Sequence, residues 1–371
     1  SDLTSPHRGA VSPLKSRKRR KSCLPASMSP STAGADRQFT QTMSRHTKTL
    51  IAGATGQIGS SVGSHLIQSG DDWNPIGLAR RPPPSAAFPM IAVDLTDSAD
   101  CKLRLGGLED VTHIVYAARF THFGGAPESV ETNVAMLANL IDAVEPVAHG
   151  LKHVHLVHGT KYYGHTVRER AVPYREEDAC GNPGSFYLPQ QRLLEQRQQG
   201  RDWTWSVSRP HAFCNHRDDE PRNMILVVAI YATLLRELGL PLIFPGTARS
   251  FDALTQFSWL PTLSRAIAWM MRTPKCANQA YNVVNGDPMR WRDLWPTLAA
   301  YFGMKPGGPD GSSFAGFVAD KAPLWNAIVK RHNLRPTDLH TIAQWPYGDY
   351  VLSVQWDVVS DMSKAARDGF T

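Results

Sequence analysis

The fold is decided by the stretch Lys48-Thr49-Leu50-Ile51-Ala52-Gly53-Ala54-Thr55-Gly56-Gln57-Ile58-Gly59, in which an apolar run opens directly into three glycines spaced three residues apart. In a dinucleotide-binding turn the first glycine, here Gly53, permits a tight turn. Gly56 lets the backbone approach a pyrophosphate, and Gly59 lets the following helix pack closely on its strand. Because a helical pattern follows and ends near Gly70, the stretch predicts a strand, a phosphate-binding turn and a helix whose N-terminus faces the phosphates.

Strand and helix patterns alternate beyond this turn. We expect further strands at residues 74–79, 90–93, 112–118, 153–157 and 203–208, and helices at residues 128–147 and 187–199. This alternation predicts an α/β fold: a doubly wound (Rossmann) parallel sheet with helices on both faces and ligands at the C-terminal ends of the strands. Later residues favour helices at 223–237, 258–272 and 290–302, with one short strand at 280–284.

These patterns divide the chain into three expected parts. They are a disordered basic tail at residues 1–46, an NAD(P)-binding Rossmann domain at residues 47–210, and a helix-rich substrate-binding region at residues 211–371 that is interleaved with the Rossmann domain. The tail carries nine Lys or Arg residues against two acidic residues, so the whole net charge of +7 belongs to it. Its basic cluster at residues 15–21 is either a targeting or polyanion-binding patch or a solvated segment. Met43 is a candidate start of the enzyme proper.

Composition narrows the class of protein. The longest apolar run, residues 224–235, is too short to span a bilayer. The five cysteines are odd in number and form no CxxC pair, which is typical of reduced thiols in an intracellular protein. We therefore expect a cytoplasmic protein, with nuclear or organellar targeting by the basic tail left open. We expect no nucleic acid to be required for activity, and a homodimer is left open.

Two arginines indicate the cofactor. Arg80 and Arg81 follow the second predicted strand, where an acid would favour NADH and arginine accommodates the 2′-phosphate of NADPH. Because guanidinium–phosphate pairs are bidentate and charge-assisted, the sequence predicts NADPH. Asp94 and Leu95, after the third strand, are expected to border the adenine. The remaining predicted cofactor contacts lie in the glycine turn and at the ends of two later strands: Thr55, Gln57, Ile58, Ala117 and His211. For His211, a structural role is the alternative.

The motifs that carry chemistry are unusual for a short-chain reductase. Such enzymes normally have a tyrosine followed four residues later by a lysine on one helix, and residues 47–210 contain no such pair. They contain instead Gly159-Thr160-Lys161-Tyr162-Tyr163-Gly164 after the fifth strand and Ser185-Phe186-Tyr187-Leu188 at the start of the next helix. Three further motifs accompany them: Gly77-Leu78-Ala79-Arg80-Arg81-Pro82, Tyr281-Asn282-Val283-Val284-Asn285-Gly286-Asp287 and Trp291-Arg292-Asp293-Leu294-Trp295. With these motifs the chain, from about residue 48 to at least residue 302, resembles the progesterone 5β-reductase/iridoid synthase-like reductases (PRISE), a branch of the extended short-chain dehydrogenases.

The resemblance implies roles for two residues. Lys161 takes the place of the family's catalytic lysine and Tyr187 that of the catalytic tyrosine, now on separate segments. The lysine would bond the nicotinamide ribose and lower the pKa of the tyrosine, whose hydroxyl would donate to a substrate carbonyl. In family members that reduce enones, hydride from NADPH goes to the β-carbon and the tyrosine stabilises the enolate.

The chain departs from the family pattern around both catalytic residues. The differing residues are Ser185, Leu188 and Gln191-Arg192 on the tyrosine helix, and His158 and His165 beside the lysine motif. These changes bear on how a substrate is oriented. Tyr162 and Tyr163 are rivals of Tyr187 as the acid.

Two further groups of residues invite functional interpretation. Seven of them are candidates for an apolar substrate pocket, with ordinary core packing as the alternative: Phe120, Phe123, Phe213, Met224, Tyr231, Phe257 and Trp259. His153, His155 and His158 suggest a metal, since the first two share a strand face. No carboxylate or cysteine joins them at ligand spacing, so we expect no metal site.

The sequence therefore predicts an NADPH-dependent reductase of a hydrophobic small molecule, with 1,4-reduction of an enone as the leading hypothesis. Reduction of the carbonyl carbon itself, or the reverse alcohol oxidation, uses the same residues and is the first alternative. A regulatory protein that senses NADP(H) without turnover is the second.

Overall fold

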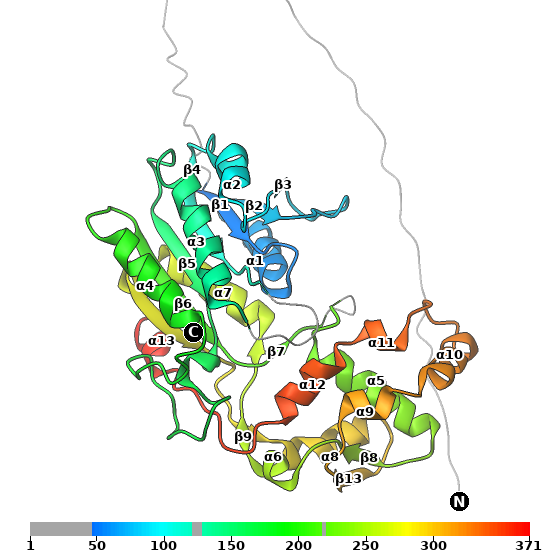
Figure 1. Ribbon diagram of the computed structural model, residues 1–371. Helices are drawn as coiled ribbons and strands as arrows, with labels where there is room; N and C mark the ends of the chain where they lie inside the picture. Colours follow the sequence, from blue (N-terminus) through cyan, green and yellow to red (C-terminus); the bar gives the residue numbers. More distant parts are fainter. Residues whose placement is uncertain (1–46, 121–127, 217–219) are drawn as a thin grey trace, which may run out of the picture. The chain divides into compact units, whose positions relative to one another are not determined.

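A seven-stranded parallel sheet organises the part of the chain that the structure, a computed structural model, describes: residues 47–120, 128–216 and 220–371 (Figure 1). Its strands are β1 (Thr47–Ala52), β2 (Trp73–Ala79), β3 (Met90–Ala92), β4 (Val111–Tyr116), β5 (His153–Val157), β6 (Thr204–Pro210) and β11 (Gln279–Val283). Their spatial order is β11-β6-β5-β4-β1-β2-β3, so the chain moves outward in both directions from β1. In such sheets a crevice opens at the carboxyl ends of the two strands where the order reverses, here β1 and β4. The predicted fold class is confirmed.

Helices cover both faces of this sheet. One face packs against α2 (Ser98–Leu105), α3 (Val130–Val144) and α4 (Tyr187–Gln198), and the other against α1 (Gln57–Gln68) and α7 (Leu260–Arg272). Successive strand residues point to opposite faces, so Leu50 joins the first core and Ile51 the second. Both side chains are fully buried, which explains why the second half of β1 is apolar.

The structure differs from the predicted elements near the sheet in two places, and it adds several short elements after residue 240 that were not predicted. Helix α2 was not predicted, because its eight residues bury only Cys101 and Leu105; Asp97 caps it by accepting a hydrogen bond from the Ala99 amide at 2.8 Å. The helix expected at residues 258–272 begins two residues later. Its first two expected residues form β10 (Ser258–Trp259), which pairs with β7 (Phe213–Cys214).

A second group of helices follows β6 in sequence. Figure 1 shows α5 (Met224–Glu237), α8 (Trp291–Tyr301), α9 (Phe314–Val318) and α12 (Trp345–Leu352) gathered together, and they share one apolar core. The other elements are short: α6 (Ala248–Asp252), α10 (Ala322–Arg331), α11 (Leu339–Ile342), α13 (Ser363–Arg367), β8 (Leu242–Phe244) with β13 (Pro306–Pro309), and β9 (Leu254–Thr255) with β12 (Met289–Arg290). None of the helices in the described ranges is long and apolar enough to cross a membrane.

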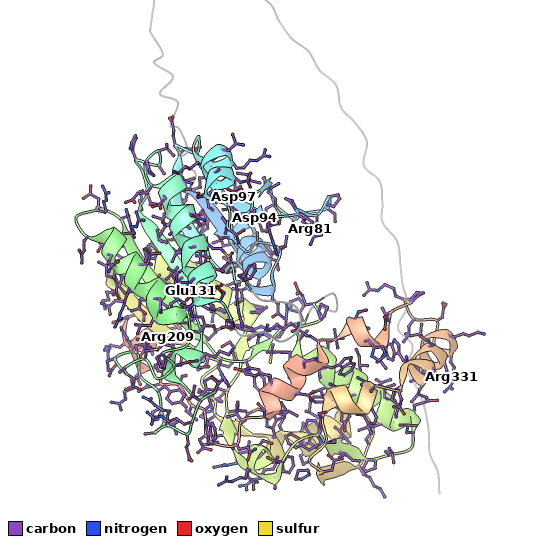
Figure 2. The ribbon with its side chains drawn as sticks, viewed as in Figure 1. Arg81, Asp94, Asp97, Glu131, Arg209 and Arg331 are labelled. Atoms are coloured by element: carbon purple, nitrogen blue, oxygen red, sulfur yellow. The ribbon has the colours of Figure 1, made fainter. Side chains whose placement is uncertain are left out.

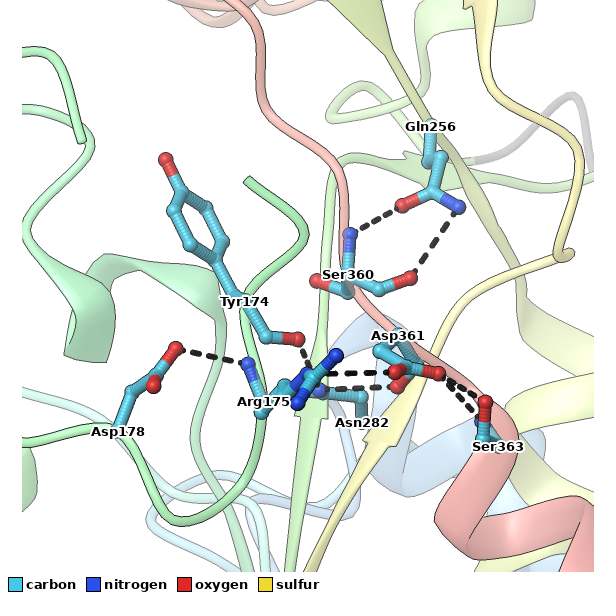
Figure 3. Close-up of polar contacts among 8 residues, drawn as sticks. All are labelled: Tyr174, Arg175, Asp178, Gln256, Asn282, Ser360, Asp361 and Ser363. Carbon is cyan, nitrogen blue, oxygen red and sulfur yellow. Dashed lines mark hydrogen bonds and ion pairs between the residues drawn. The ribbon is translucent and has the colours of Figure 1, made fainter. Parts of the chain in front are cut away.

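The chain returns from these helices to the sheet through a fastened C-terminal segment (Figure 3). Asn282 of β11 donates from Nδ2 to the carbonyl oxygens of Tyr174 at 3.0 Å and Asp361 at 3.1 Å. Gln256 Oε1 accepts a hydrogen bond from the Ser360 amide at 2.7 Å. The segment that follows α12 is therefore tied to the sheet at several points.

The described residues belong to one compact unit, and β11 hydrogen-bonds to β6 although it lies after residue 210. The boundary between residues 210 and 211 stays a prediction. The basic tail, with its cluster at residues 15–21 and Met43, lies outside the described residues, and so does Phe123.

Candidate active site

The glycine turn joins β1 to α1 with backbone packed too closely for side chains. Gly53 has a φ of +78°, and a Cβ there would lie 2.8 Å from the carbonyl carbon and oxygen of Ala117. A Cβ on Gly59 would lie 2.3 Å from the Gly53 carbonyl oxygen. No side chain caps the N-terminus of α1, so the backbone amides of its first turn are available to a ligand. This cradle fits the diphosphate of a dinucleotide.

A pocket of about 280 Å³ opens beside this turn, at the carboxyl ends of β1, β2 and β4. It brings together seven of the predicted cofactor residues: Gly53, Thr55, Gly56, Arg80, Asp94, Leu95 and Ala117. We call it the cofactor pocket. Arg81 is exposed and is not part of its lining, although Figure 2 shows it in the same region as Asp94. The Asp94 carboxylate accepts hydrogen bonds from the Thr96 amide at 2.9 Å and hydroxyl at 2.8 Å, which fixes its loop.

A smaller pocket of about 160 Å³ links this region to the predicted catalytic tyrosine. Gln57 and Ile58 of α1 line it together with Tyr187. Gln57 also donates from Nε2 to the Arg222 carbonyl oxygen at 2.8 Å, so the start of α1 is tied to the segment before α5. Gly59 lines neither pocket. Its role in the structure is to let α1 pack closely on β1.

Lys161 and Tyr187 both line a third pocket, which we call the catalytic pocket. Lys161 lies in a short 3-10 helix (Thr160–Tyr163) that follows β5. Gly164 ends this helix with a φ of +82°, and a Cβ there would lie 2.3 Å from the Gly181 carbonyl oxygen. Tyr187 is the first residue of α4. The two residues are therefore 26 positions apart in sequence, yet line one cavity.

The ring of Tyr187 is held by packing, while its hydroxyl makes no hydrogen bond to any residue in the described ranges. It stacks on the imidazole of His158 with ring centroids 4.5 Å apart, and the edge of Phe186 lies 4.8 Å away. The backbone of Gly159 runs beside the hydroxyl; a Cβ there would lie 3.4 Å from it. A substrate oxygen can therefore accept from Tyr187 without competing with a protein partner.

The electrostatics of the catalytic pocket favour a protonated lysine and a neutral phenol at neutral pH. Burial, followed by the positive charges of Arg119 and Arg222, lowers the pKa of Lys161 to about 8. Burial raises the pKa of Tyr187, and the same two arginines act in the opposite direction. Lys161 Nζ lies 3.7 Å from the Glu128 carboxylate and 5.3 Å from the centre of the Tyr350 ring.

Histidines in this pocket are neutral at pH 7. Burial lowers the pKa of His158 to about 3 and that of His165 to about 4, and it holds the pKa of His211 well below its usual value. His211 Nδ1 is 2.6 Å from the Thr160 hydroxyl, and the His211 amide donates to the Ser258 hydroxyl at 2.9 Å. His211 thus lines the catalytic pocket and also holds β6 to the lysine motif; its contact with nicotinamide stays a prediction.

The rival tyrosines do not line this pocket. Tyr163 donates from its hydroxyl to Asn282 Oδ1 at 2.7 Å and accepts from Arg209 Nη1 at 3.1 Å. The same guanidinium lies 3.6 Å from the centre of the Tyr162 ring. Both rings therefore pack against a buried arginine, Arg209. Tyr301 and Lys305 have the four-residue spacing of a reductase pair, but Tyr301 is 83% exposed and outside the catalytic pocket.

The expectation of one apolar pocket is wrong for most of the residues proposed. Phe213 does line the catalytic pocket. Phe120 lines the cofactor pocket, and Tyr231 is buried in the core with its ring 5.0 Å from that of Phe314. Met224 and Phe257 line a separate apolar cavity of about 400 Å³ between α5 and α8. Trp259 lines none of these pockets; its ring lies 5.7 Å from that of His216.

The histidines of β5 serve strand pairing. His153 Nε2 and His155 Nδ1 each lie 2.7 Å from the Ser206 hydroxyl on the neighbouring strand, β6. In the three described ranges, no group of three or more His, Cys, Asp or Glu side chains is placed to hold a metal ion.

Sequence reasoning missed several residues that line the catalytic pocket, four of them charged or aromatic: Arg119, Arg222, Tyr347 and Tyr350. Arg119 follows β4 and faces all three pockets near the turn. Its place directly after a predicted strand end was a usable signal, since ligands bind there in parallel sheets. The other three come from the segment before α5 and from α12, and no local pattern marks them.

Comparisons with known proteins agree with this architecture. The family model described as "PRISE-like Rossmann-fold domain" matches residues 93–367. The chain is 31% identical over 342 residues to the (S)-8-oxocitronellyl enol synthase ISY2 of Nepeta cataria, covering 86% of this chain and 85% of that protein. It is 30% identical to the 3-oxo-Delta(4,5)-steroid 5-beta-reductase of Arabidopsis thaliana, covering 86% of each, and 30% identical to the short chain dehydrogenase gsfE of Penicillium aethiopicum, covering 87% and 92%.

Among solved structures the chain is similar to the UDP-glucose 4-epimerase of Thermus thermophilus, determined as a complex with NAD. The TM-score is 0.59 at 18% identity, and the match covers 87% of this chain and 93% of that one. At this identity the likeness shows the Rossmann-like fold alone. The match to the family model and the relatives in sequence show that the chain belongs to the PRISE-like Rossmann-fold family and is an oxidoreductase.

Proposed function

We propose that this oxidoreductase uses NADPH to reduce an α,β-unsaturated carbonyl compound, with hydride added to the β-carbon and Tyr187 bound to the carbonyl oxygen. The observation that carries the proposal is that Tyr187 and Lys161 line one pocket, which borders the glycine turn through a second pocket that Tyr187 shares with Gln57 and Ile58. The related proteins named as a steroid 5-beta-reductase and as an enol synthase support it.

Tyr187 is the hydrogen-bond donor in this mechanism. Burial raises its pKa, so its phenol keeps its proton at neutral pH and can donate to the substrate oxygen. As negative charge accumulates on that oxygen, the hydrogen bond strengthens and stabilises the enolate. When bound, NADPH supplies the hydride that the β-carbon receives. A proton from solvent then reaches the α-carbon, which leaves the saturated carbonyl compound.

Lys161 supplies positive charge beside this donor. With a pKa of about 8 it is mainly protonated at pH 7, and we expect its Nζ to bond a ribose hydroxyl of the cofactor. Its positive charge also lowers the free energy of the transition state in which negative charge develops on the enolate oxygen. Phe213, Val351 and Val354 give the same pocket an apolar wall, which suits the hydrocarbon part of a substrate.

The choice of NADPH rests on Arg80. Its side chain lines the cofactor pocket after β2, where the 2′-phosphate of the adenosine ribose would lie. No carboxylate follows β2 to take the ribose 2′-hydroxyl in the way that NADH prefers. Arg81 follows it outside the pocket lining and adds to the positive potential there.

Oxidation of NADPH by the purified protein, followed with cyclic enones, linear enones and aldehydes, tests the proposal. We expect NADPH to be consumed with at least one class of enone and NADH to be used poorly. Consumption with aldehydes alone, or with no compound in the panel, would contradict the proposal.

A further inference from the structure

Two arginines that no motif predicted face the catalytic pocket. Arg119 follows β4 and Arg222 lies two residues before α5, and both line the pocket that holds Lys161 and Tyr187. Its described lining contains these three cations and no carboxylate. The histidines of the lining are neutral at pH 7, as their lowered pKa values show, so they add no further positive charge.

The protein offsets this charge incompletely. Glu128 forms ion pairs with Arg119 and Lys161. Arg222 has no ion pair with any carboxylate in the described ranges; its guanidinium lies 4.8 Å from the centre of the Tyr347 ring. The Nε atoms of Arg119 and Arg222 are both buried and have no hydrogen-bond acceptor among the described residues.

Such an arrangement is costly without a ligand. A buried N–H of a charged group that lacks an acceptor has lost its hydrogen bonds to water, and no protein hydrogen bond compensates for that loss of free energy. A guanidinium presents its N–H groups as a planar fork that matches the two oxygens of a carboxylate. An anionic ligand would supply the missing acceptors and balance the charge.

The two arginines differ in the pockets that they line. Arg119 lines the cofactor pocket as well as the catalytic pocket, so it is within reach of both. Arg222 is absent from the lining of the cofactor pocket; it lines the catalytic pocket and, together with Gly56 and Tyr187, the smaller pocket between the two. Arg222 is therefore the better candidate for a substrate anion, and the Kd of NADPH is the measurement that distinguishes this role from binding of the cofactor.

We propose that the substrate carries a carboxylate, which Arg222 and Arg119 bind while Tyr187 contacts the carbonyl oxygen. The substrate class is then an enone acid with a hydrocarbon body against Phe213, Val351 and Val354. This inference rests on the proposed function of the same pocket. It assigns Arg222 as the residue that determines specificity for charge.

The test compares a cyclohexenone carboxylate with the matching cyclohexenone carboxamide, which differ mainly in charge. We expect the wild-type protein to prefer the acid in kcat/KM by about 10-fold to 100-fold, as hydrogen bonds to charged groups allow. In Arg222→Gln this preference should fall towards unity while the Kd of NADPH stays within about twofold. Arg331→Gln is the matched control, because Arg331 pairs with Glu237 on the surface and should leave the preference unchanged.

Two results would overturn the inference: equal use of acid and amide by the wild-type protein, or a weaker Kd for NADPH in Arg222→Gln with the preference unchanged. If neither compound is reduced, the proposed function fails while the inference is still decided by calorimetry with the saturated acid and amide on the protein–NADP⁺ complex. Tighter binding of the acid, lost in Arg222→Gln, would support it. Equal binding would contradict it.

Discussion

The cofactor pocket and the catalytic pocket lie side by side, yet they come from different parts of the sequence. Gly53, Thr55, Gly56 and Arg80 of the cofactor pocket lie in one stretch around β1 and β2, and nearly all the rest of its lining follows β3 and β4. The catalytic pocket takes Lys161, Tyr187, Arg222 and Tyr350 from four separate segments. The difference teaches that binding of the cofactor and chemistry on the substrate are separable here, so variants in one pocket should change affinity and variants in the other should change turnover.

The largest effect is expected at Tyr187. Tyr187→Phe removes the hydroxyl that stabilises the enolate but keeps the ring stacked on His158, so turnover should fall about 100-fold or more while the Kd of NADPH is unchanged. Steady-state kinetics and fluorescence titration with NADPH measure the two quantities. Tyr301→Phe, at an exposed hydroxyl, is the control. A matching loss of NADPH affinity in Tyr187→Phe would break the separation of the two pockets.

The glycine turn should respond in stability and cofactor binding. A Cβ at Gly59 would meet the Gly53 carbonyl oxygen at 2.3 Å, so Gly59→Ala forces α1 away from β1. We expect the free energy of unfolding to fall by about 1–3 kcal/mol and NADPH to bind more weakly. Gly107→Ala is the matched control, since nothing lies within 4 Å of a Cβ there. Urea unfolding of both variants decides the point, and equal stability of the two would show that the turn is less tightly packed than described.

Arg80 and Arg81 allow a comparison within the cofactor pocket. Arg80→Ser should weaken NADPH binding about tenfold and leave NADH binding nearly unchanged, because it removes a charge-assisted hydrogen bond to the 2′-phosphate. Arg81→Ser should have a smaller effect, since Arg81 lies outside the lining of the cofactor pocket. The Kd values of both cofactors for both variants are the measurement. If Arg81→Ser weakened NADPH binding more than Arg80→Ser, the 2′-phosphate would instead bind at Arg81, outside the pocket lining.

The smallest expected effect is a change in pH dependence. Because burial and two arginines lower the pKa of Lys161 to about 8, the free protein loses this positive charge as the pH rises through that value. We expect kcat/KM for NADPH to decline above about pH 8 and the decline to move to higher pH in Lys161→Arg. Lys102→Arg, on the exposed surface of α2, should leave the profile in place. A decline at the same pH in Lys161→Arg would assign it to another group.

The cofactor pocket could be predicted from the sequence much more fully than the catalytic pocket. The strands and the glycine turn could be predicted because their signals are local: a run of apolar residues, a glycine spacing and a helical pattern. Seven of the predicted cofactor residues line one pocket for that reason. Arg81 is outside this lining although Arg80 is part of it, because only tertiary structure decides which of two neighbouring arginines borders the cavity.

The walls of the catalytic pocket could be predicted only in part. Lys161 and Tyr187 were found through resemblance to a family, since neither spacing nor composition marks them. Arg222 and Tyr350 could not be found, because they reach the pocket through the packing of α5 and α12 on one apolar core. The apolar candidates Met224 and Tyr231 failed for a related reason: hydrophobicity predicts burial, not the cavity that a buried side chain faces.

The central claim is that hydride reaches the β-carbon of an enone while Tyr187 holds its oxygen. It is tested most directly with NADPH that carries deuterium at the transferred position of C4, a cyclic enone and analysis of the product by NMR. The account predicts a saturated ketone with deuterium on the β-carbon. Deuterium on the carbonyl carbon of an allylic alcohol would contradict it.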